Sequence, residues 1–331
     1  MSNTDFDNLF AGFSNIKAGV IGDVMLDVYW WGHVERISPE APVPIVALDR
    51  KEYRIGGAGN VALNLAALGA EVSVLTVMGA DDNGATLTDL FNQHRINTGW
   101  LLLQPSRITT TKTRIISRNQ QMMRLDAEIT KELSVDDENA LLEKVRQYIV
   151  TEKPQVIIFE DYNKGILTER VIKEVTALCK QHGIITTVDP KRKNFFSYEG
   201  VDIFKPNLKE VKDGLNLLVD EVNLPTLNDI HQQLQKKLNH SISFITLSEK
   251  GVFFQNDTTS RIIPSHLRNI ADVSGAGDTV IAVASLIYAA TRRIDLMAEV
   301  ANIAGGLVCE EVGTVAVNKD SLLQECKLLL T

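Results

Sequence analysis

Residues 56–79 read GGAGNVALNLAALGAEVSVLTVMG, and this stretch contains the pattern that decides the fold. A glycine-rich turn is followed by a helical apolar pattern at Asn60–Leu68 and then by a short apolar strand at Val72–Val77. A helix that is followed closely by a buried strand is typical of an α/β protein.

The same alternation continues on both sides of this stretch. Further strands are predicted at Ala18–Ile21, Val156–Phe159, Ile184–Val188, Ile203–Phe204 and Ser243–Leu247, and further helices at Asp136–Val150, Glu169–His182 and Leu208–Leu217. Strands that alternate with helices predict a mainly parallel central sheet that is covered by helices on both faces. We therefore expect an α/β fold with three layers.

Two segments do not fit this alternation. Residues 29–54 contain three prolines and an alternating stretch at Val43–Leu48, and Thr109–Arg118 is rich in β-branched residues. Both predict strands outside the main sheet, which we interpret as a small β-sheet lid inserted at about residues 27–55 and 108–126. Such a lid would cover ligands at the carboxyl ends of the strands. No linker divides the chain, so we expect a single domain over residues 1–331.

The composition excludes several classes of function. The 331 residues include 34 basic and 42 acidic ones, a net charge of −8, which argues against binding to nucleic acid or to a membrane surface. The three cysteines lack the spacing of a metal site and indicate free thiols in a reducing compartment. Neither a signal peptide nor an apolar stretch long enough to span a membrane is seen, so we expect a cytoplasmic protein.

Residues 272–279, Asp-Val-Ser-Gly-Ala-Gly-Asp-Thr, give the strongest local signal for chemistry. Gly275, Ala276 and Gly277 form a tight turn before an apolar helix, and N–H groups at a helix start attract anions. An acid beside a bound phosphate suggests that Asp278 is a general base for phosphoryl transfer. The alternative is an ordinary helix start with an aspartate cap.

Residues 57–62 also fit the G-x-G-x-x-A pattern of dinucleotide sites. The residues before them, 49–54, do not form a buried strand, so we do not expect a dinucleotide there. Instead, Gly57 would let a sugar approach the backbone, and Asn60 would present an amide to its hydroxyls.

These two motifs resemble the two signatures of the ribokinase-like (PfkB) carbohydrate kinases. Residues 56–79 match the N-terminal signature, with Gly69 and Gly79 at the family's spacing, and residues 272–279 match the C-terminal one. The resemblance implies the ribokinase-like fold, ATP and Mg²⁺ as cofactors, and Asp278 as the general base.

A closer resemblance links four further segments to the kinase domain of bifunctional heptose-phosphate kinase/ADP-heptose synthases. These segments are residues 22–32 (GDVMLDVYWWG), 36–46 (RISPEAPVPIV), 117–126 (SRNQQMMRLD) and 161–165 (DYNKG). The resemblance implies phosphorylation of D-glycero-β-D-manno-heptose 7-phosphate at C1, giving the 1,7-bisphosphate for ADP-heptose and lipopolysaccharide core synthesis. It also suggests a homodimer.

The sequence ends at Thr331 and has no HxGH motif. We therefore expect no nucleotidyltransferase domain here, and a separate nucleotidyltransferase acting later in the pathway. Two alternatives stay open, namely a kinase for another sugar or sugar phosphate, and a non-catalytic sugar-binding regulatory relative.

The resemblance also implies which residues bind the sugar. Asp27, Gly57 and Asn60 would contact its hydroxyls. Its 7-phosphate needs cations, and the candidates are Lys112, Arg114, Arg118, Arg124, Lys164 and Lys191. Arg118 and Lys164 are preferred because they lie in the best-matching motifs, as does Asp161, a further candidate for substrate binding.

The nucleotide side is implied in the same way. Asn207 and Glu210 resemble an N-x-x-E motif that is associated with Mg²⁺ and the donor phosphates, and their alternative is a strand-end turn with a helix-start acid. Thr246, Ser248 and Gly251 resemble a T-L-G-x-x-G nucleotide strand, with Ser248 replacing a glycine, and Asn302 resembles a residue near the adenine.

A monovalent cation such as K⁺ is a further possibility that the resemblance implies. Asp272 and Ser274 fall at the matching positions, with Glu311 and Gly313 on the facing loop.

Overall fold

An eight-stranded sheet forms the centre of the computed structural model, which describes residues 4–118, 120–218 and 221–330. The strand order is β14-β13-β12-β11-β10-β9-β1-β4. The strands from β12 to β4 pair in parallel, whereas β13, near one edge, pairs antiparallel with both β12 and β14. The strands are β1 (Lys17–Gly22), β4 (Glu71–Leu75), β9 (Val156–Glu160), β10 (Ile185–Asp189), β11 (Ile203–Phe204), β12 (Ile242–Thr246), β13 (Val252–Gln255) and β14 (Ser260–Ile263).

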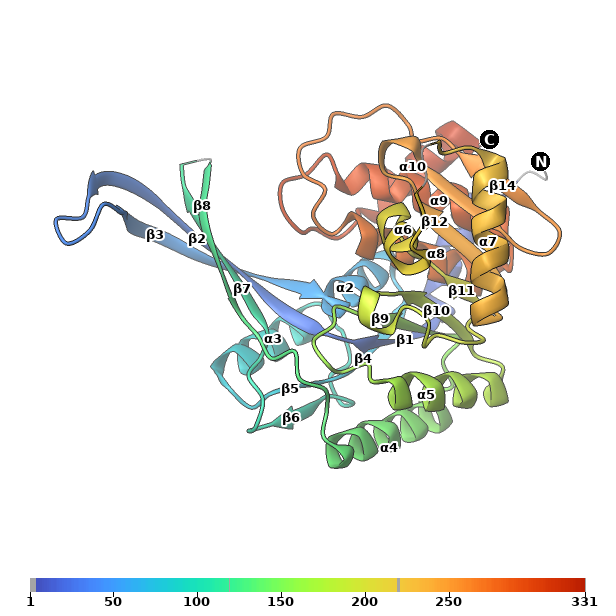
Figure 1. Cartoon of the computed structure of the whole chain (residues 1–331), viewed down its shortest axis with the longest axis horizontal. Helices are drawn as coiled ribbons and strands as arrows, with labels where there is room; N and C mark the ends of the chain where they lie inside the picture. Colours follow the sequence, from blue (N-terminus) through green and yellow to red (C-terminus); the bar gives the residue numbers. More distant parts are fainter. Residues whose placement is uncertain (1–3, 119, 219–220, 331) are drawn as a thin grey trace.

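Helices cover both faces of this sheet (Figure 1). In β9, Val156 and Ile158 pack into one apolar core and Ile157 and Phe159 into the other, as expected for a strand that is buried on both sides. The helices of the first core are α1 (Phe6–Ala11), α2 (Ala58–Leu68), α3 (Asp82–Gln93), α8 (Ala276–Thr291), α9 (Ile294–Val308) and α10 (Lys319–Leu330). Those of the second are α4 (Val135–Glu152), α5 (Glu169–His182), α6 (Leu208–Leu215) and α7 (Leu224–Leu238). Short 3₁₀ turns lie at Gly12–Asn15, Arg192–Asn194 and Ser248–Lys250.

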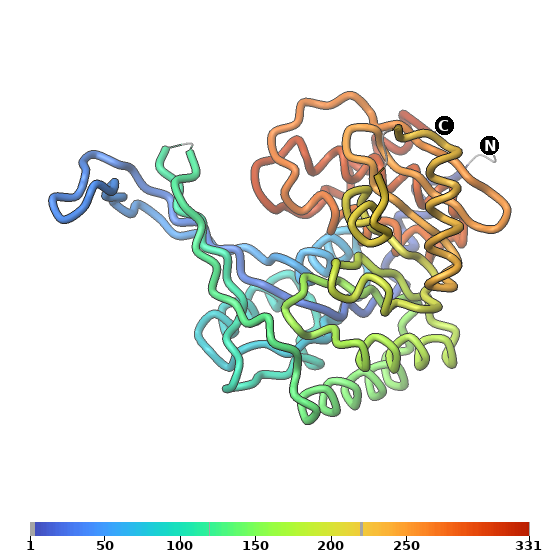
Figure 2. The backbone as a smooth tube through the Cα atoms, in the orientation of Figure 1, coloured from blue at the N-terminus to red at the C-terminus, as the bar shows by residue number. Residues whose placement is uncertain are grey.

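A second sheet, called the flap sheet below, projects from the body as two hairpins (Figure 2). Its order is β3-β2-β7-β8, with β2 (Val24–Ile37), β3 (Pro44–Gly57), β7 (Thr111–Ser117) and β8 (Gln120–Ala127). The register gives it a polar face, where Asp27 pairs with Arg54 and Lys112. On the opposite, more apolar face, Val28 is opposite Tyr53, Ile115 is opposite Met123, and Leu125 is opposite Thr113.

The predicted three-layer fold with a mainly parallel sheet is confirmed, and the predicted helix at Glu169–His182 has the expected ends. The single strand predicted at Val72–Val77 is wrong. β4 ends at Leu75, and β5 (Val77–Gly79) pairs in a separate sheet with β6 (Leu102–Gln104). Between them, the buried Thr76 donates its hydroxyl to the Gly22 carbonyl at 2.7 Å, which fixes the point where the chain leaves the central sheet.

No helix in the described part of the chain has both the length and the apolar character that are needed to cross a membrane.

Candidate active site

Segments that are far apart in the sequence meet where the central strands end. Asp278 lies in the first turn of α8 and is buried. Asn60 of α2 donates its side-chain amide to Asp278 Oδ2 at 2.9 Å, and Tyr162 donates its hydroxyl to Asp278 Oδ1 at 2.7 Å. The structure thus brings the predicted Asp278 and Asn60 into direct contact.

Glycine is required at position 275, in the turn before α8, for two reasons. Gly275 has a φ of 78°, and a Cβ atom there would lie 2.8 Å from the amide nitrogen of Asn60. Gly277 faces a charged pair, since a Cβ at this position would lie 3.6 Å from Asp189 Oδ2 and 3.9 Å from Lys205 Nζ. The first N–H groups of a helix lack acceptors within it, so the start of α8 at Ala276 favours an anion beside Lys205.

Burial raises the pKa of Asp278 to about 6, although the hydrogen bonds from Asn60 and Tyr162 favour its charged form. At pH 7 to 8 this carboxylate is therefore mostly ionised. Its pKa is close enough to neutral pH for the group to accept a proton during the reaction.

A charge cluster lies beside the start of α8. The ammonium group of the buried Lys205 lies 2.8 Å from Asp189 Oδ2, and that of Lys191 lies 3.0 Å from Asp189 Oδ1 and 2.8 Å from Glu210 Oε1. Burial alone would raise the pKa of Asp189, but the two lysines outweigh it and lower this pKa. Two cations are thus held at one end of the sheet by neighbouring acids.

Four members of this site were not among the predicted residues, namely Glu160, Tyr162, Asp189 and Lys205. Glu160 and Asp189 are the last residues of β9 and β10, so an acid directly after a predicted apolar strand was the signal that could have found them. Glu160 is fully buried, and neither of its carboxyl oxygens has a hydrogen-bond partner among the described residues. Burial raises its pKa well above the usual range.

Asn207 and Glu210 form a capping box at the start of α6. The Asn207 side chain accepts the Glu210 N–H at 2.8 Å, and the Glu210 carboxylate accepts the Asn207 N–H at 2.8 Å. The alternative of a helix-start acid therefore describes the local geometry. The second oxygen of Glu210 meets Lys191, which places this motif next to the charge cluster.

The predicted nucleotide segment follows β12. Thr246 ends this strand and forms a bridge to Asn207, so the two predicted motifs are neighbours. Ser248 has a φ of 58°, a conformation that glycine adopts more easily, and Gly251 has no room for a Cβ, which would lie 2.0 Å from the Ile263 carbonyl. Asn302 lies in α9 and donates its side-chain amide to the Pro264 carbonyl at 2.9 Å.

The loop before α8 is tied to the loop before α10. Asp272 accepts the N–H and hydroxyl of Ser274 at 3.0 and 2.8 Å, and it also accepts the N–H of Gly313 at 2.9 Å. Arg54 of the flap sheet donates to the Val312 and Thr314 carbonyls on either side of Gly313 at 3.2 and 3.3 Å. The flap sheet is thus linked to the start of α8 through this loop.

Asp27 lies in β2, on the polar face of the flap sheet. Its carboxylate accepts a hydrogen bond from Arg114 at 2.8 Å and a longer one from Thr314 at 3.4 Å. A Cβ on Gly56 would lie 2.7 Å from Asp27 Oδ2, so glycine is needed beside it. At Gly57, with a φ of 59°, a Cβ would lie 2.4 Å from the Asp23 carbonyl.

The predicted phosphate-binding cations differ in their partners. Lys164 pairs with Glu128 at 2.7 Å, and Arg124 with Asp126 at 2.8 Å. Arg118 is exposed in the turn at the outer end of the β7–β8 hairpin, so the structure does not bring it next to Lys164 (Figure 2). Lys112 is half-buried with its ammonium 5.4 Å from the Tyr162 ring centroid, and it forms no ion pair with any described residue.

Asp161 is buried, and neighbouring donors occupy its carboxylate. Its carboxylate accepts hydrogen bonds from the Asn194 amide at 3.1 Å, the Tyr198 hydroxyl at 2.7 Å and the Asn163 N–H at 2.7 Å. In this structure Asp161 therefore holds its own loop in place.

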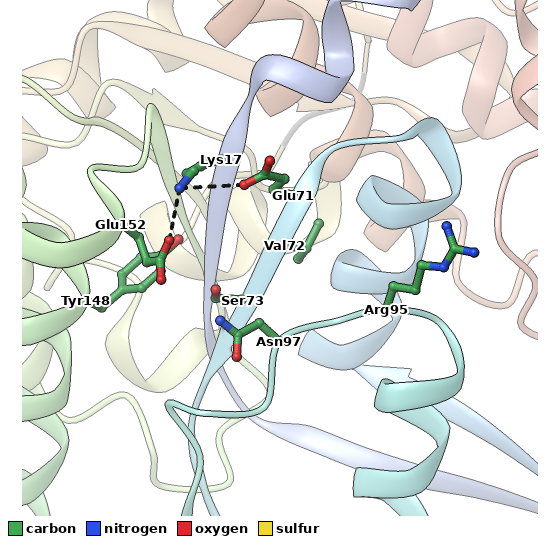
Figure 3. Close-up of a pocket in the computed structure, with 8 residues that line it drawn as sticks. All are labelled: Lys17, Glu71, Val72, Ser73, Arg95, Asn97, Tyr148 and Glu152. Carbon is green, nitrogen blue, oxygen red and sulfur yellow. Dashed lines mark hydrogen bonds and ion pairs between the residues drawn. The ribbon is translucent and has the colours of Figure 1, made fainter.

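A cavity of about 210 Å³ lies at the opposite end of the sheet (Figure 3). Lys17 and Glu71, which line it, begin β1 and β4, whereas the site described above lies where the parallel strands end. Lys17 is held there by Glu152 at 3.0 Å and Glu71 at 3.6 Å. None of the predicted site residues lines this cavity.

The matching family identifies the class of protein. The pfkB family carbohydrate kinase model matches residues 16–321, so the chain belongs to the pfkB family of carbohydrate kinases. Membership of a kinase family is consistent with the site described above, which combines a buried acid, a helix start and clustered cations.

The chain is similar to the bifunctional protein HldE of two bacteria. It is 39% identical to that of Geotalea uraniireducens over 328 residues, which cover 98% of this chain and 66% of the relative. It is 39% identical to that of Geobacter sulfurreducens over 321 residues, which cover 96% and 64%. The chain thus spans less than two thirds of the length of these curated relatives.

Solved structures show the fold. Escherichia coli phosphofructokinase-2 in complex with potassium has a TM-score of 0.78 at 16% identity, covering 96% of this chain and 100% of that one. Arabidopsis thaliana ribokinase complexed with ribose and ATP has a TM-score of 0.73 at 15% identity, covering 93% and 99%. The predicted ribokinase-like fold is therefore confirmed.

Proposed function

We propose that this carbohydrate kinase transfers the γ-phosphoryl group of ATP to the C1 hydroxyl of D-glycero-β-D-manno-heptose 7-phosphate. The observation that carries the proposal is the buried Asp278 carboxylate, held by two donors in the first turn of α8. The segments that resemble heptose-phosphate kinases and the similarity to the HldE proteins support this sugar as the substrate.

In the proposed reaction, the C1 oxygen forms a bond to the γ-phosphorus while the bond from that phosphorus to the ADP oxygen breaks. Asp278 accepts the proton that the C1 hydroxyl loses. Its pKa of about 6 suits this role, because the group is ionised before the reaction and is not too weak a base. The N–H groups at the start of α8 and the nearby Lys205 would stabilise the transferred phosphoryl group.

We propose that Asn207 and Glu210 contact Mg²⁺ indirectly, through bound water, because Asn207 Oδ1 and both carboxylate oxygens of Glu210 already accept hydrogen bonds. No group of three or more His, Cys, Asp or Glu among the described residues is arranged to hold a metal, so water and phosphate oxygens would complete its coordination. When bound, Mg²⁺ neutralises charge on the ATP phosphates. We further propose Thr246, Ser248, Gly251 and Asn302 as the contacts of the nucleotide.

A site for K⁺ is proposed at the two loops that Asp272 joins. The Asp272 carboxylate and the nearby carbonyl groups are the hard oxygen donors that such a cation needs, and the hydrogen bond from Gly313 to Asp272 keeps the loops together.

The polar face of the flap sheet is proposed to select a phosphorylated sugar. Asp27 would bind sugar hydroxyls near Gly57 and Asn60, and Lys112 would bind the 7-phosphate. Lys112 is the favoured cation because it is half-buried beside Tyr162 and has no ion pair among the described residues, so a phosphate need not displace a carboxylate. Lys164 could join it by exchanging its partner Glu128.

We also propose a homodimer that is formed through the apolar face of the flap sheet. Tyr53, Met123 and Leu125 lie on this face and are 41%, 54% and 48% exposed. Apolar side chains gathered on one face of a projecting sheet favour an interface with a second copy. Light scattering coupled to gel filtration would give the mass of a dimer, and a monomer at micromolar concentration would contradict this proposal.

An assay of ADP release tests the proposed activity. The enzyme is given ATP and Mg²⁺ with the heptose 7-phosphate, with the same heptose lacking the phosphate, or with no sugar. We expect turnover with the first substrate only. Turnover on a different sugar or sugar phosphate would favour the alternative of another pfkB kinase, and sugar binding without turnover would favour a regulatory relative.

A further inference from the structure

Tyr162 lies between the flap sheet and the central sheet, and it contacts the acid at the centre of the site. Its hydroxyl donates to Asp278 Oδ1 at 2.7 Å, while Asn60 holds the other oxygen of Asp278 at 2.9 Å. With a donor on each oxygen, the carboxylate cannot rotate without losing a hydrogen bond.

The backbone of Tyr162 is held by a buried carboxylate. Asp23 accepts the N–H groups of Tyr162 at 2.8 Å, Lys164 at 3.0 Å and Ile166 at 3.2 Å. Three hydrogen bonds to the side chain of Asp23, which lies between β1 and β2, fix the course of this loop and therefore the position of the Tyr162 backbone.

The ring of Tyr162 is flanked by two cations. The ammonium groups of Lys112, from the flap sheet, and Lys191, from the loop after β10, lie 5.4 and 5.5 Å from its centroid. Burial raises the pKa of the Tyr162 phenol well above its usual range. The phenol therefore stays protonated and serves as a donor to Asp278 throughout the physiological range.

On the basis of the proposed function, we propose that Tyr162 is a positioning residue for phosphoryl transfer. Its hydroxyl holds Asp278 so that the carboxylate faces the acceptor hydroxyl of the sugar.

The groups that surround Asp278 define what the loss of this hydroxyl would do. Besides Asn60 and Tyr162, charged or ionisable groups act on Asp278 from the ends of β9 and β10 and from the loop after β10, namely Glu160, Asp189 and Lys191. Removing the Tyr162 hydroxyl removes a hydrogen bond that favours the charged carboxylate. The pKa of Asp278 should then rise further above 6.

The test is a pH titration of Asp278 in the whole protein with and without the Tyr162 hydroxyl. The protein is labelled with ¹³C at aspartate carboxyls, and the resonance of Asp278 is assigned by its loss in Asp278→Asn. In Tyr162→Phe we expect the midpoint of this resonance to move up by about 0.5 to 1 pH unit. This shift alone lowers the ionised fraction of Asp278 at pH 6 by about two- to fivefold, so we expect kcat/KM to fall by at least that factor at pH 6 and by less at pH 8.5.

Tyr148→Phe is the matched control. It removes the hydroxyl of another buried tyrosine, which lies beside the cavity at the other end of the sheet (Figure 3). Neither the Asp278 midpoint nor the pH profile should change in this variant. Tyr162→Met removes the same hydroxyl in another way and replaces Tyr162→Phe if that variant does not fold.

An unchanged Asp278 midpoint in Tyr162→Phe would overturn the proposal, and so would wild-type activity of this variant at pH 8.5, where Asp278 is ionised in both proteins and only its position differs. A lower KM for the sugar with an unchanged kcat would also overturn it, because the hydroxyl would then merely occupy the place of the acceptor. The titration needs no sugar, so it decides the role of Tyr162 even if the wild-type enzyme does not act on heptose 7-phosphate.

Discussion

The charge cluster at the end of the central sheet and the polar face of the flap sheet both carry cations, but they hold them differently. In the cluster, Lys205 and Lys191 share Asp189 at 2.8 and 3.0 Å, and Lys205 is only 2% exposed. On the flap sheet, Lys112 has no ion pair among the described residues, and the hairpins project away from the body (Figure 1). Arg114 on the same face is already paired with Asp27 at 2.8 Å, so the contrast is with Lys112 alone. The difference suggests that the charge cluster is organised before substrate arrives, whereas Lys112, the proposed phosphate ligand, becomes paired only when the sugar binds.

The largest expected effect is that of Asp278→Asn. Loss of the base should lower kcat by about 10²- to 10⁴-fold, because an amide cannot accept the proton of the C1 hydroxyl. Steady-state ADP release measures it, and wild-type turnover in this variant would refute the assignment.

The same variant should be more stable than the wild type at pH 8. The folded-state pKa of Asp278 is raised, so the penalty of burying its charge is present above pH 6 and disappears as the group is protonated towards pH 4. The gain in free energy of unfolding is expected to be about 2 to 3 kcal/mol at pH 8 and near zero at pH 4. Urea denaturation at both pH values measures this gain. An equal gain at pH 8 and pH 4 would contradict a raised pKa of Asp278 in the folded protein.

Lys205→Met should destabilise the protein by about 3 kcal/mol, because it leaves the buried Asp189 with only one of its two cations. Lys193→Met is the matched control, since Lys193 is half exposed and pairs with the exposed Glu132 at 2.6 Å. Its effect should be below about 0.5 kcal/mol. Urea denaturation measures both changes in the free energy of unfolding. Similar values for the two variants would contradict the claim that the buried charge cluster is held more firmly than a surface ion pair.

Lys112→Met should raise the KM for heptose 7-phosphate by about 10- to 30-fold, which corresponds to the loss of one charge-assisted contact, and should leave the KM for ATP unchanged. Lys144→Met is the control, because Lys144 is also a half-buried lysine above an aromatic ring, 5.8 Å from the centroid of Trp100, but lies outside the site. An equal change in KM for both substrates would place Lys112 outside sugar recognition.

The smallest expected effect concerns the strain at Ser248. A φ of 58° costs a residue with a Cβ about 1 kcal/mol. We therefore expect Ser248→Gly to raise the free energy of unfolding, by no more than about 1 kcal/mol. The opposite kind of substitution at a neighbouring position, Gly251→Ser, should strongly destabilise the protein, because a Cβ at residue 251 meets the Ile263 carbonyl. A strong loss of stability in Ser248→Gly would show that the serine side chain has a role that its backbone does not explain.

The sequence allowed the layers of the fold to be predicted because its apolar periodicity is regular, as at Glu169–His182. It did not allow the break at Thr76 to be predicted, since a side-chain hydrogen bond to Gly22, distant in the sequence, determines where β4 ends. Antiparallel β13 and β14 were not predicted, because short apolar runs do not reveal their direction.

The candidate site was predictable where a motif carries it, as for Asp278 and Asn60. Partners that come from other strand ends, such as Asp189 and Glu160, were not, because their role depends on the order of strands in the sheet. The preference for Arg118 came from its motif alone, and a motif does not show that a residue lies at the outer end of a hairpin.

The position of the new phosphate on the sugar tests the central claim most directly. After reaction of the wild-type enzyme with ATP and heptose 7-phosphate, phosphorus and proton NMR of the product should show a second phosphate coupled to the anomeric proton at C1. A phosphate on any other carbon, or ADP formed without a sugar bisphosphate, would contradict the account.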